Sequence, residues 1–163
     1  MQVFSLLLIL ATFLCALVTG ITLIFATVIM PGLKTLGPRG YLEAFKAVDR
    51  VIQGGQPVFM AVWLGSALTL IAAALLGFFH LKGIPQYLLL AALTMYIGGV
   101  QIATTVVNVP LNNQLQAQNL DELDEKSIAE LRQAFDSRWL RWNTLRTWFG
   151  ALTTIILLYL LKS

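Results

Sequence analysis

The chain has 163 residues, of which 58% are hydrophobic and 12% charged, and its net charge is +3. Soluble domains carry about 25% charged residues, so the composition excludes an ordinary soluble domain and predicts a single integral membrane domain over residues 1–163. The basic residues form no dense block and are not interleaved with aromatic ones, which argues against nucleic acid as a partner.

The first predicted element is a membrane-spanning helix over residues 3–30, which contain no charge. A signal peptide would have a basic start and an apolar stretch of only about 7–15 residues. No lysine or arginine precedes Lys34, so we expect an uncleaved span. Cys15, the only cysteine, is expected to be a small buried hydrophobic residue.

An amphipathic helix is predicted next, in the sequence PRGYLEAFKAVDRVIQ (38–53). Its apolar positions at helical spacing are Leu42, Phe45, Val48 or Asp49, and Ile52. This pattern is typical of a helix lying near the membrane surface.

Two further spans are expected over residues 57–79 and 84–107. In the second span, small residues recur every four positions and predict a face for close helix packing: Gly65, Thr69, Ala73 and Gly77. Gly98 and Gly99 are expected to do the same in the third span.

The third span ends in the sequence NVPLNNQL (108–115), the densest amide cluster of the chain. Pro110 disfavours helical geometry at Val109, so we expect the helix to kink or restart there, with Asn108 capping the next turn. Alternatively, the cluster lines a binding site as part of one polar helical stripe: Gln101, Thr104 or Thr105, Asn108 and Asn112.

A long helix is predicted from Asp124 or Ser127, as its cap, into a fourth span over residues 142–161. Its apolar residues lie close to heptad spacing: Ile128, Leu131, Phe135, Trp142, Leu145 and Phe149. Trp139, Asn143 and Arg146 share one face, with Trp142 beside it. Arg146 either extends to the lipid headgroups or faces the bundle interior, where it would offer donors to a ligand.

The fold class expected from these elements is an all-α transmembrane four-helix bundle, with amphipathic or extended helices in the first and third connections. Every lysine and arginine except Lys82 and Lys162 lies in those two connections or at the start of the last span. The positive-inside rule therefore places both connections in the cytoplasm, and we expect a bacterial cytoplasmic membrane.

NVPLNNQL and, about thirty residues later, WLRWNTLRTW resemble the DUF1772 family, which includes anthrone oxygenases. The sequence EAFKAVDRVIQ, and Gly20 with Pro31, are similar as well. The resemblance implies a four-helix membrane protein that oxidises an anthrone to an anthraquinone with dioxygen, without a metal. The residues that match are Asn108, Pro110, Asn112, Trp142, Asn143 and Arg146. At Asp49 the chain departs from the asparagine expected in the family.

The first functional hypothesis is an oxidoreductase acting on a flat phenolic or anthrone-like substrate. Arg146 and Asn143 would stabilise an oxyanion, and Asp49 would be the base. The substrate-binding candidates are Asn108, Asn112, Trp142, which would stack on the ring, Gln101 and Gln56. With a lone His80 and a lone Cys15, we expect no metal and no bound cofactor.

The alternative is a non-catalytic membrane protein that binds a lipid or quinone, or an accessory subunit of a larger complex. In both hypotheses the expected partners are a hydrophobic small molecule and membrane lipids. Assembly into a homo-oligomer is compatible with either.

Overall fold

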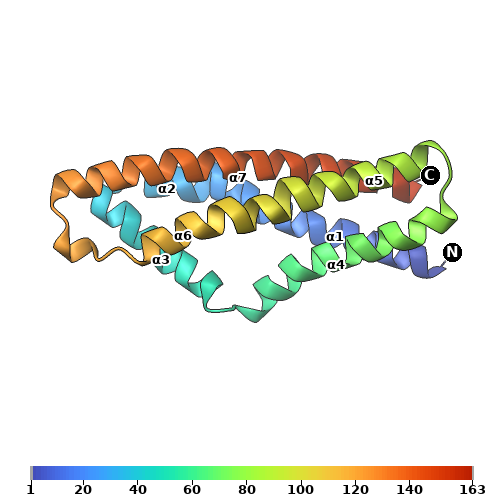
Figure 1. Cartoon of the computed structure of the whole chain (residues 1–163), viewed down its shortest axis with the longest axis horizontal. Helices are drawn as coiled ribbons and strands as arrows, with labels where there is room; N and C mark the ends of the chain where they lie inside the picture. Colours follow the sequence, from blue (N-terminus) through green and yellow to red (C-terminus); the bar gives the residue numbers. More distant parts are fainter. Residues whose placement is uncertain (1, 163) are drawn as a thin grey trace.

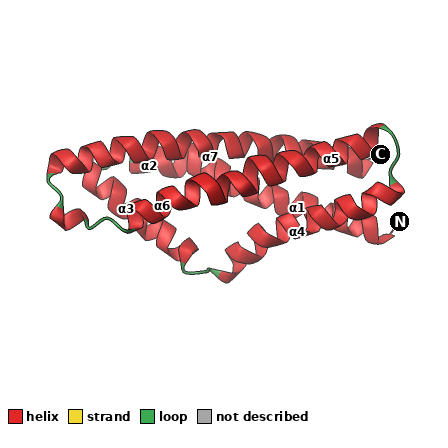
Figure 2. Cartoon of the chain, in the orientation of Figure 1, coloured by secondary structure: helices red, strands yellow, loops and turns green. Residues whose placement is uncertain are grey.

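The computed structural model describes residues 2–162, and within them it contains helices and short connections without a strand (Figure 2). This confirms the predicted all-α class. The elements are α1 (Gln2–Ile24), η1 (Phe25–Ile29), α2 (Met30–Leu33), α3 (Pro38–Gln53), α4 (Pro57–His80), α5 (Ile84–Tyr96), η2 (Ile97–Ile102), η3 (Thr104–Asn108), α6 (Val109–Gln116), η4 (Leu120–Glu122) and α7 (Glu125–Lys162).

Four continuous helical runs are long and apolar enough to cross a membrane: Gln2–Leu33, Pro57–His80, Ile84–Gln116 and Glu125–Lys162. In Figure 1, α7 extends along the whole molecule, with α1 and the α5–α6 run beside it. Both ends of the described chain lie at one end of the bundle, and the two long connections lie at the other (Figure 1). The predicted four-helix bundle is therefore confirmed, while its orientation in the membrane stays a prediction.

The second span, α4, completes the bundle and packs against α1 and α5. Its amino-terminal half diverges from α6, and α3 returns toward α6 from the α3–α4 joint (Figure 1). Two glycines of α4 allow the close approach: a Cβ at Gly65 would lie 3.3 Å from Leu14, and a Cβ at Gly77 would collide with Leu89. The predicted small-residue face of the second span is thus confirmed at these two positions.

On the third span, Gly99 lies against Phe149 of α7, where an added Cβ would collide with the ring and lie 2.8 Å from the Cβ of Phe149. Gly98, in contrast, has no neighbour within 4 Å of such a Cβ. The predicted packing role is therefore confirmed for Gly99 and wrong for Gly98. Adjacent residues of a helix point in directions about 100° apart, so only one of them can face α7.

We expect Gly99→Ala and Gly98→Ala to have opposite effects on stability. The first forces α7 away from the third span and should lower the free energy of unfolding by about 1–3 kcal/mol. The second adds a methyl group in open space and should raise it by up to about 1 kcal/mol through helix propensity. Thermal unfolding of the purified protein in mild detergent, followed by circular dichroism, measures both. Equal stability of the two variants would contradict this close contact.

The third helical run does not break at its proline. Asn108 has helical dihedral angles, φ −71° and ψ −41°, and its side chain makes no capping bond. The predicted restart of the helix with Asn108 as its cap is therefore wrong. Instead, the N–H of Val109 bonds to the carbonyl of Thr104, five residues back, as in a π-helix. This wider turn separates the ring of Pro110 from the carbonyl it would meet in a regular α-helix.

The sequence left open whether Val48 or Asp49 lies on the inward face of α3. Asp49 is 3% exposed and Val48 is 39% exposed, so the carboxylate faces inward. The apolar face predicted for this helix packs on α6 and α7, rather than being left for the membrane surface. The aromatic and aliphatic residues in this cluster include Tyr41, Leu42, Phe45, Leu115, Phe135 and Trp139.

The α7 helix is unbroken over 38 residues, as predicted, and Asp124 caps it by accepting the N–H of Ser127 at 2.8 Å. Its buried face differs from the predicted heptad stripe after Phe135. From there on, the buried residues of α7 include Trp139, Asn143, Arg146, Gly150 and Thr153. The expected Trp142, Leu145 and Phe149 lie outside it because a straight α-helix drifts by about 20° per heptad from a 3.5-residue repeat.

Candidate functional site

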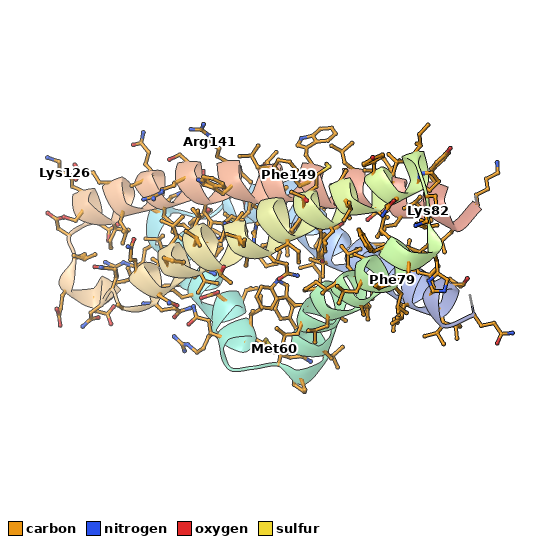
Figure 3. The ribbon with its side chains drawn as sticks, turned by 45° about the vertical axis from the view of Figure 1, so that its right-hand side comes forward. Met60, Phe79, Lys82, Lys126, Arg141 and Phe149 are labelled. Carbon is orange, nitrogen blue, oxygen red and sulfur yellow. The ribbon has the colours of Figure 1, made fainter. Side chains whose placement is uncertain are left out.

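A cavity of about 420 Å³ lies between α1, α3, α4, the third helical run and α7. Ligand sites for small molecules usually have volumes of about 300–1,000 Å³. Met60, near the α3–α4 joint, marks its α4 side (Figure 3). Large apolar side chains make up much of its wall: Phe25, Phe45, Phe59, Met60, Trp63 and Trp139. Such a wall suits a flat, hydrophobic molecule.

Arg146 lines this cavity and is only 7% exposed. Its Nη1 donates to Thr104 Oγ1 at 2.8 Å, and its Nη2 donates to Asn143 Oδ1 at 2.8 Å. Asn143 in turn donates to the backbone carbonyl of Thr22 in α1 at 2.9 Å. The guanidinium is therefore fixed between three helices, and the alternative in which Arg146 extends to the lipid headgroups is excluded.

No carboxylate among residues 2–162 forms an ion pair with Arg146. The guanidinium carbon lies 5.8 Å from the centre of the Trp139 ring, a weak cation–π contact. A buried charge without a counter-ion is costly. The cavity should therefore favour a ligand that brings an anionic or strongly accepting oxygen to this arginine.

Asp49 lies in the same cavity and is the only carboxylate in its lining. Three side-chain amides donate to it: Gln53 at 2.7 Å, Asn112 at 2.7 Å and Gln116 at 2.9 Å. Burial raises the pKa of Asp49, and the three amide donors oppose that rise without cancelling it. The site thus combines a cation on α7 with a carboxylate on α3 that binds a proton more readily than usual.

Trp139 connects the two charged groups. Its Nε1 donates to Asn112 Oδ1 at 2.8 Å, and its backbone carbonyl accepts Asn108 Nδ2 at 3.3 Å. Its ring packs edge-on against Phe45 at 5.3 Å between centroids. Trp139 therefore contacts both the polar stripe of the third helical run, through its indole and its backbone carbonyl, and the middle of α3, through its ring.

The site residues predicted from sequence are mostly brought together. Five of them line the cavity: Asp49, Asn108, Asn112, Asn143 and Arg146. Trp142 does not, and Trp139 takes the place expected for it. The signal for Trp139 was present in the sequence, since it shares a helical face with Asn143 and Arg146 at intervals of four and three residues.

Two predicted binding residues have structural contacts instead. Gln101 donates to the carbonyl of Trp63 at 3.2 Å and to Ser66 Oγ at 3.3 Å, which ties the third helical run to α4. Gln56 caps α4 by accepting the N–H of Phe59. Neither lines the cavity.

Sequence reasoning missed the apolar part of the wall and did not name two polar lining residues, Thr22 and Asn113, as site residues. Thr22 belongs to a span that carries no charge, and nothing in the local pattern distinguishes it. Gln53, which the sequence placed near Asp49 at this end of the bundle, lies one turn after it and lines the cavity.

A family model described as anthrone oxygenase matches residues 49–156 of the chain. The matched stretch begins at Asp49 and contains all the polar lining residues except Thr22. No curated protein and no solved structure matches significantly.

Proposed function

We propose, from the premise that this chain belongs to the anthrone oxygenase family, that it oxidises a flat phenolic or anthrone-like substrate with dioxygen in the cavity. The observation that carries the proposal is the buried Arg146, which has no counter-ion among residues 2–162 and is fixed beside an aromatic wall in the same cavity as Asp49. The bundle would lie in the bacterial cytoplasmic membrane with its two long connections in the cytoplasm.

The first step is removal of a proton from the carbon opposite the ketone of the substrate. In this proposal Asp49 accepts that proton, and the electron pair of the broken C–H bond moves through the ring to the ketone oxygen. Arg146 donates to the resulting oxyanion, which lowers the free energy of the carbanion-like state. Asn143 acts as a positioning residue, since its amide is already bonded to Arg146 and to α1.

The second step consumes dioxygen. The electron-rich carbon reduces dioxygen and forms a C–O bond, and the proton held by Asp49 completes a hydroperoxide. Loss of the remaining C–H proton, with cleavage of the O–O bond, releases water and leaves a second carbonyl. In net terms, one anthrone and one dioxygen give one anthraquinone and one water.

Oxygen consumption by the purified protein in liposomes, with anthrone as the substrate, tests the proposal. We expect saturable uptake above the spontaneous rate, with one quinone formed for each dioxygen consumed. Uptake no faster than in empty liposomes would refute it. Anthrone binding without turnover would instead favour a protein that binds a lipid or quinone.

The pH dependence of kcat/KM should reflect the protonation of Asp49. Because only the carboxylate accepts a proton, kcat/KM should fall as the pH is lowered through the pKa of Asp49, at a midpoint above its ordinary value of 3.8. Asp49→Asn should remove this acidic limb and reduce kcat/KM by about 10²–10⁴-fold. Steady-state rates between pH 4 and 8 measure both.

The free energy of unfolding should depend on pH in the opposite direction from kcat/KM, because protonated Asp49 stabilises the fold. The folded protein binds the Asp49 proton more tightly than the unfolded chain does, so protonation stabilises the fold below pH 3.8. This contribution is lost as the pH rises through the raised pKa. The Asp49→Asn variant should lack that dependence. If kcat/KM of the Asp49→Asn variant fell at low pH as it does in the wild type, Asp49 would be excluded as the base.

A further inference from the structure

The cavity reaches the surface of the molecule beside the joint between α3 and α4. Gln53, at the end of α3, lines the cavity and is exposed, and so are Val109 and Asn113, one turn apart on α6. Residues that both line a cavity and are exposed mark the rim of its opening. The amides of this rim suit contact with water, whereas the nearby Val58 and Val106 are 67% and 65% exposed and suit contact with lipid. The opening therefore lies where membrane and water meet.

One side of this opening is the end of α3 and the start of α4, residues 50–62, which we call the elbow. In Figure 1, α3 and α4 form a V with their joint at its apex, and the elbow is that apex. Both arms of the V are fixed to the bundle further away. On α3, Tyr41 donates to Asp136 Oδ1 of α7 at 2.9 Å, and on α4, Ser66 Oγ accepts from Tyr96 of α5 at 2.7 Å. The elbow is thus a segment between two anchored regions.

The elbow itself is held loosely. In the described part of the chain, its hydrogen bonds all join residues close together in sequence, such as Gln53 with Asp49 and the N–H of Gly55 with the carbonyl of Ile52. Gly55 has a φ of +76°, a conformation that favours glycine, and a Cβ there would have no neighbour within 4 Å. Such an unpacked glycine joint can change its backbone angles and let the two helices move relative to each other.

Hydrogen bonds from α6 to α3 lie immediately before the elbow. Gln116 Nε2 donates to Asp49 Oδ2 at 2.9 Å and to the backbone carbonyl of Lys46 at 2.9 Å. Asn112 Nδ2 donates to Asp49 Oδ1 at 2.7 Å. Asn112 lines the cavity, whereas Gln116 does not. Gln116 therefore ties α3 to α6 at two points without forming part of the ligand site.

We propose that the elbow is a lid, which bends at its glycine joint to admit a flat hydrophobic ligand from the membrane, and that Gln116 holds this lid closed. The elbow carries five residues of the cavity lining: Ile52, Gln53, Gly55, Phe59 and Met60. Its movement opens the cavity while Arg146 stays fixed by its bonds to Thr104 and Asn143. The lid rests on the proposed function for the choice of ligand, but it concerns entry and exit and requires no turnover.

A cross-link over the opening tests the lid. The double variant Gln53→Cys, Asn113→Cys places one thiol on the elbow and one on α6, at exposed positions next to the hydrogen-bonded pair of Asp49 and Asn112. A short bifunctional maleimide joins the two thiols and holds the lid closed. The matched control is the same double variant with a monofunctional maleimide on each thiol. Cys15 is fully buried and should not react in either sample.

The rates of anthraquinone binding and release are the measurement. They are followed in mild detergent by the quenching of tryptophan fluorescence, since Trp63 and Trp139 line the cavity. We expect both rates to be lower in the cross-linked protein than in the control, by about tenfold or more, because the ligand must wait for a lid that no longer opens. Anthraquinone bound before cross-linking should be trapped. Equal rates in the two samples would overturn the lid.

Gln116→Leu tests the residue that holds the lid closed. The variant loses the hydrogen bonds to Asp49 and Lys46, so we expect binding and release of anthraquinone both to become about tenfold faster. Because the two rates change by the same factor, Kd should stay as in the wild type. Gln114→Leu is the matched control, since Gln114 is an exposed amide on the same helix outside the cavity lining, and its rates should equal those of the wild type. Wild-type rates in Gln116→Leu would overturn the role of Gln116.

The cross-link decides the lid even if Gln116→Leu does not fold. Anthraquinone is already oxidised, so its exchange is measured without turnover, and oxygen uptake with anthrone is measured separately. Oxygen uptake together with exchange rates that the cross-link leaves unchanged would overturn the lid alone. Exchange that the cross-link slows, without oxygen uptake, would overturn the oxygenase alone.

Discussion

Replacement of Arg146 by glutamine is expected to lower kcat/KM for anthrone oxidation by about 10²–10³-fold, the usual cost of removing one donor from an oxyanion site. Glutamine keeps a hydrogen-bonding group on α7 but removes the positive charge and the fixed fork that Thr104 and Asn143 hold. The loss should be mainly in kcat, since the oxyanion forms only as the reaction proceeds. Oxygen uptake in liposomes, over a range of anthrone concentrations, separates kcat from KM.

Two further variants sharpen this result. Arg141→Gln makes the same change on the same helix at an exposed arginine that points away from the bundle, and it should leave kcat/KM unchanged (Figure 3). Arg146→Lys keeps the charge but cannot bond to Thr104, Asn143 and a ligand in one plane, so it should retain little of the lost rate. Full activity of Arg146→Gln, in a folded protein, would remove Arg146 from the mechanism.

Trp139→Ala is expected to be the most destabilising single change at the site, with a loss of about 3–5 kcal/mol in the free energy of unfolding. Trp139 is 4% exposed, packs between Phe25 and Phe45, and donates to Asn112. Its removal opens a cavity where α3 and the third helical run meet α7, so turnover should be lost as well. Unfolding in mild detergent, followed by circular dichroism, measures the change.

Trp142→Ala is the matched control, because this half-buried tryptophan of the same helix lies outside the cavity lining. Its loss should cost much less stability and leave oxygen uptake intact. Trp139→Phe should fall between the two, since it keeps one aromatic ring but loses part of the buried indole and the hydrogen bond to Asn112, which is worth about 0.5–1.5 kcal/mol. A larger effect for Trp142→Ala than for Trp139→Ala would contradict the assignment of the site.

The difference between Trp139 and Trp142 shows that a heptad pattern alone does not predict which face of a long helix is buried. The heptad pattern selected Trp142 because Leu131 and Phe135 lie at the spacing that continues to it. Over a helix of 38 residues, small differences between 3.5 and 3.6 residues per turn add up to a different face. Contacts with α1 and α3 decide which phase is realised, and these contacts are not local in sequence.

At Pro110, in the third helical run, a tertiary contact likewise overrides the local prediction. Local chemistry predicted that the helix would kink or restart there, with Asn108 as the cap of the next turn. A break would have taken Asn108 away from α7, whereas the π-helical turns keep the helix continuous and let its amide reach Trp139. The contact with α7 therefore overrides the local preference of the residue before a proline.

By itself, the sequence determined that this protein has four long apolar helices, an amphipathic helix before the second and an unbroken fourth helix. It also placed Asp49, Asn112, Asn143 and Arg146 toward one end of the bundle. These features follow from local composition and helical period. Only the tertiary structure decided that three amides converge on Asp49, and that within the described part of the chain Arg146 is buried without a counter-ion and Asn108 Oδ1 has no partner. Each of these depends on the rotation of one helix about its axis relative to another, which is set by packing between residues far apart in the chain.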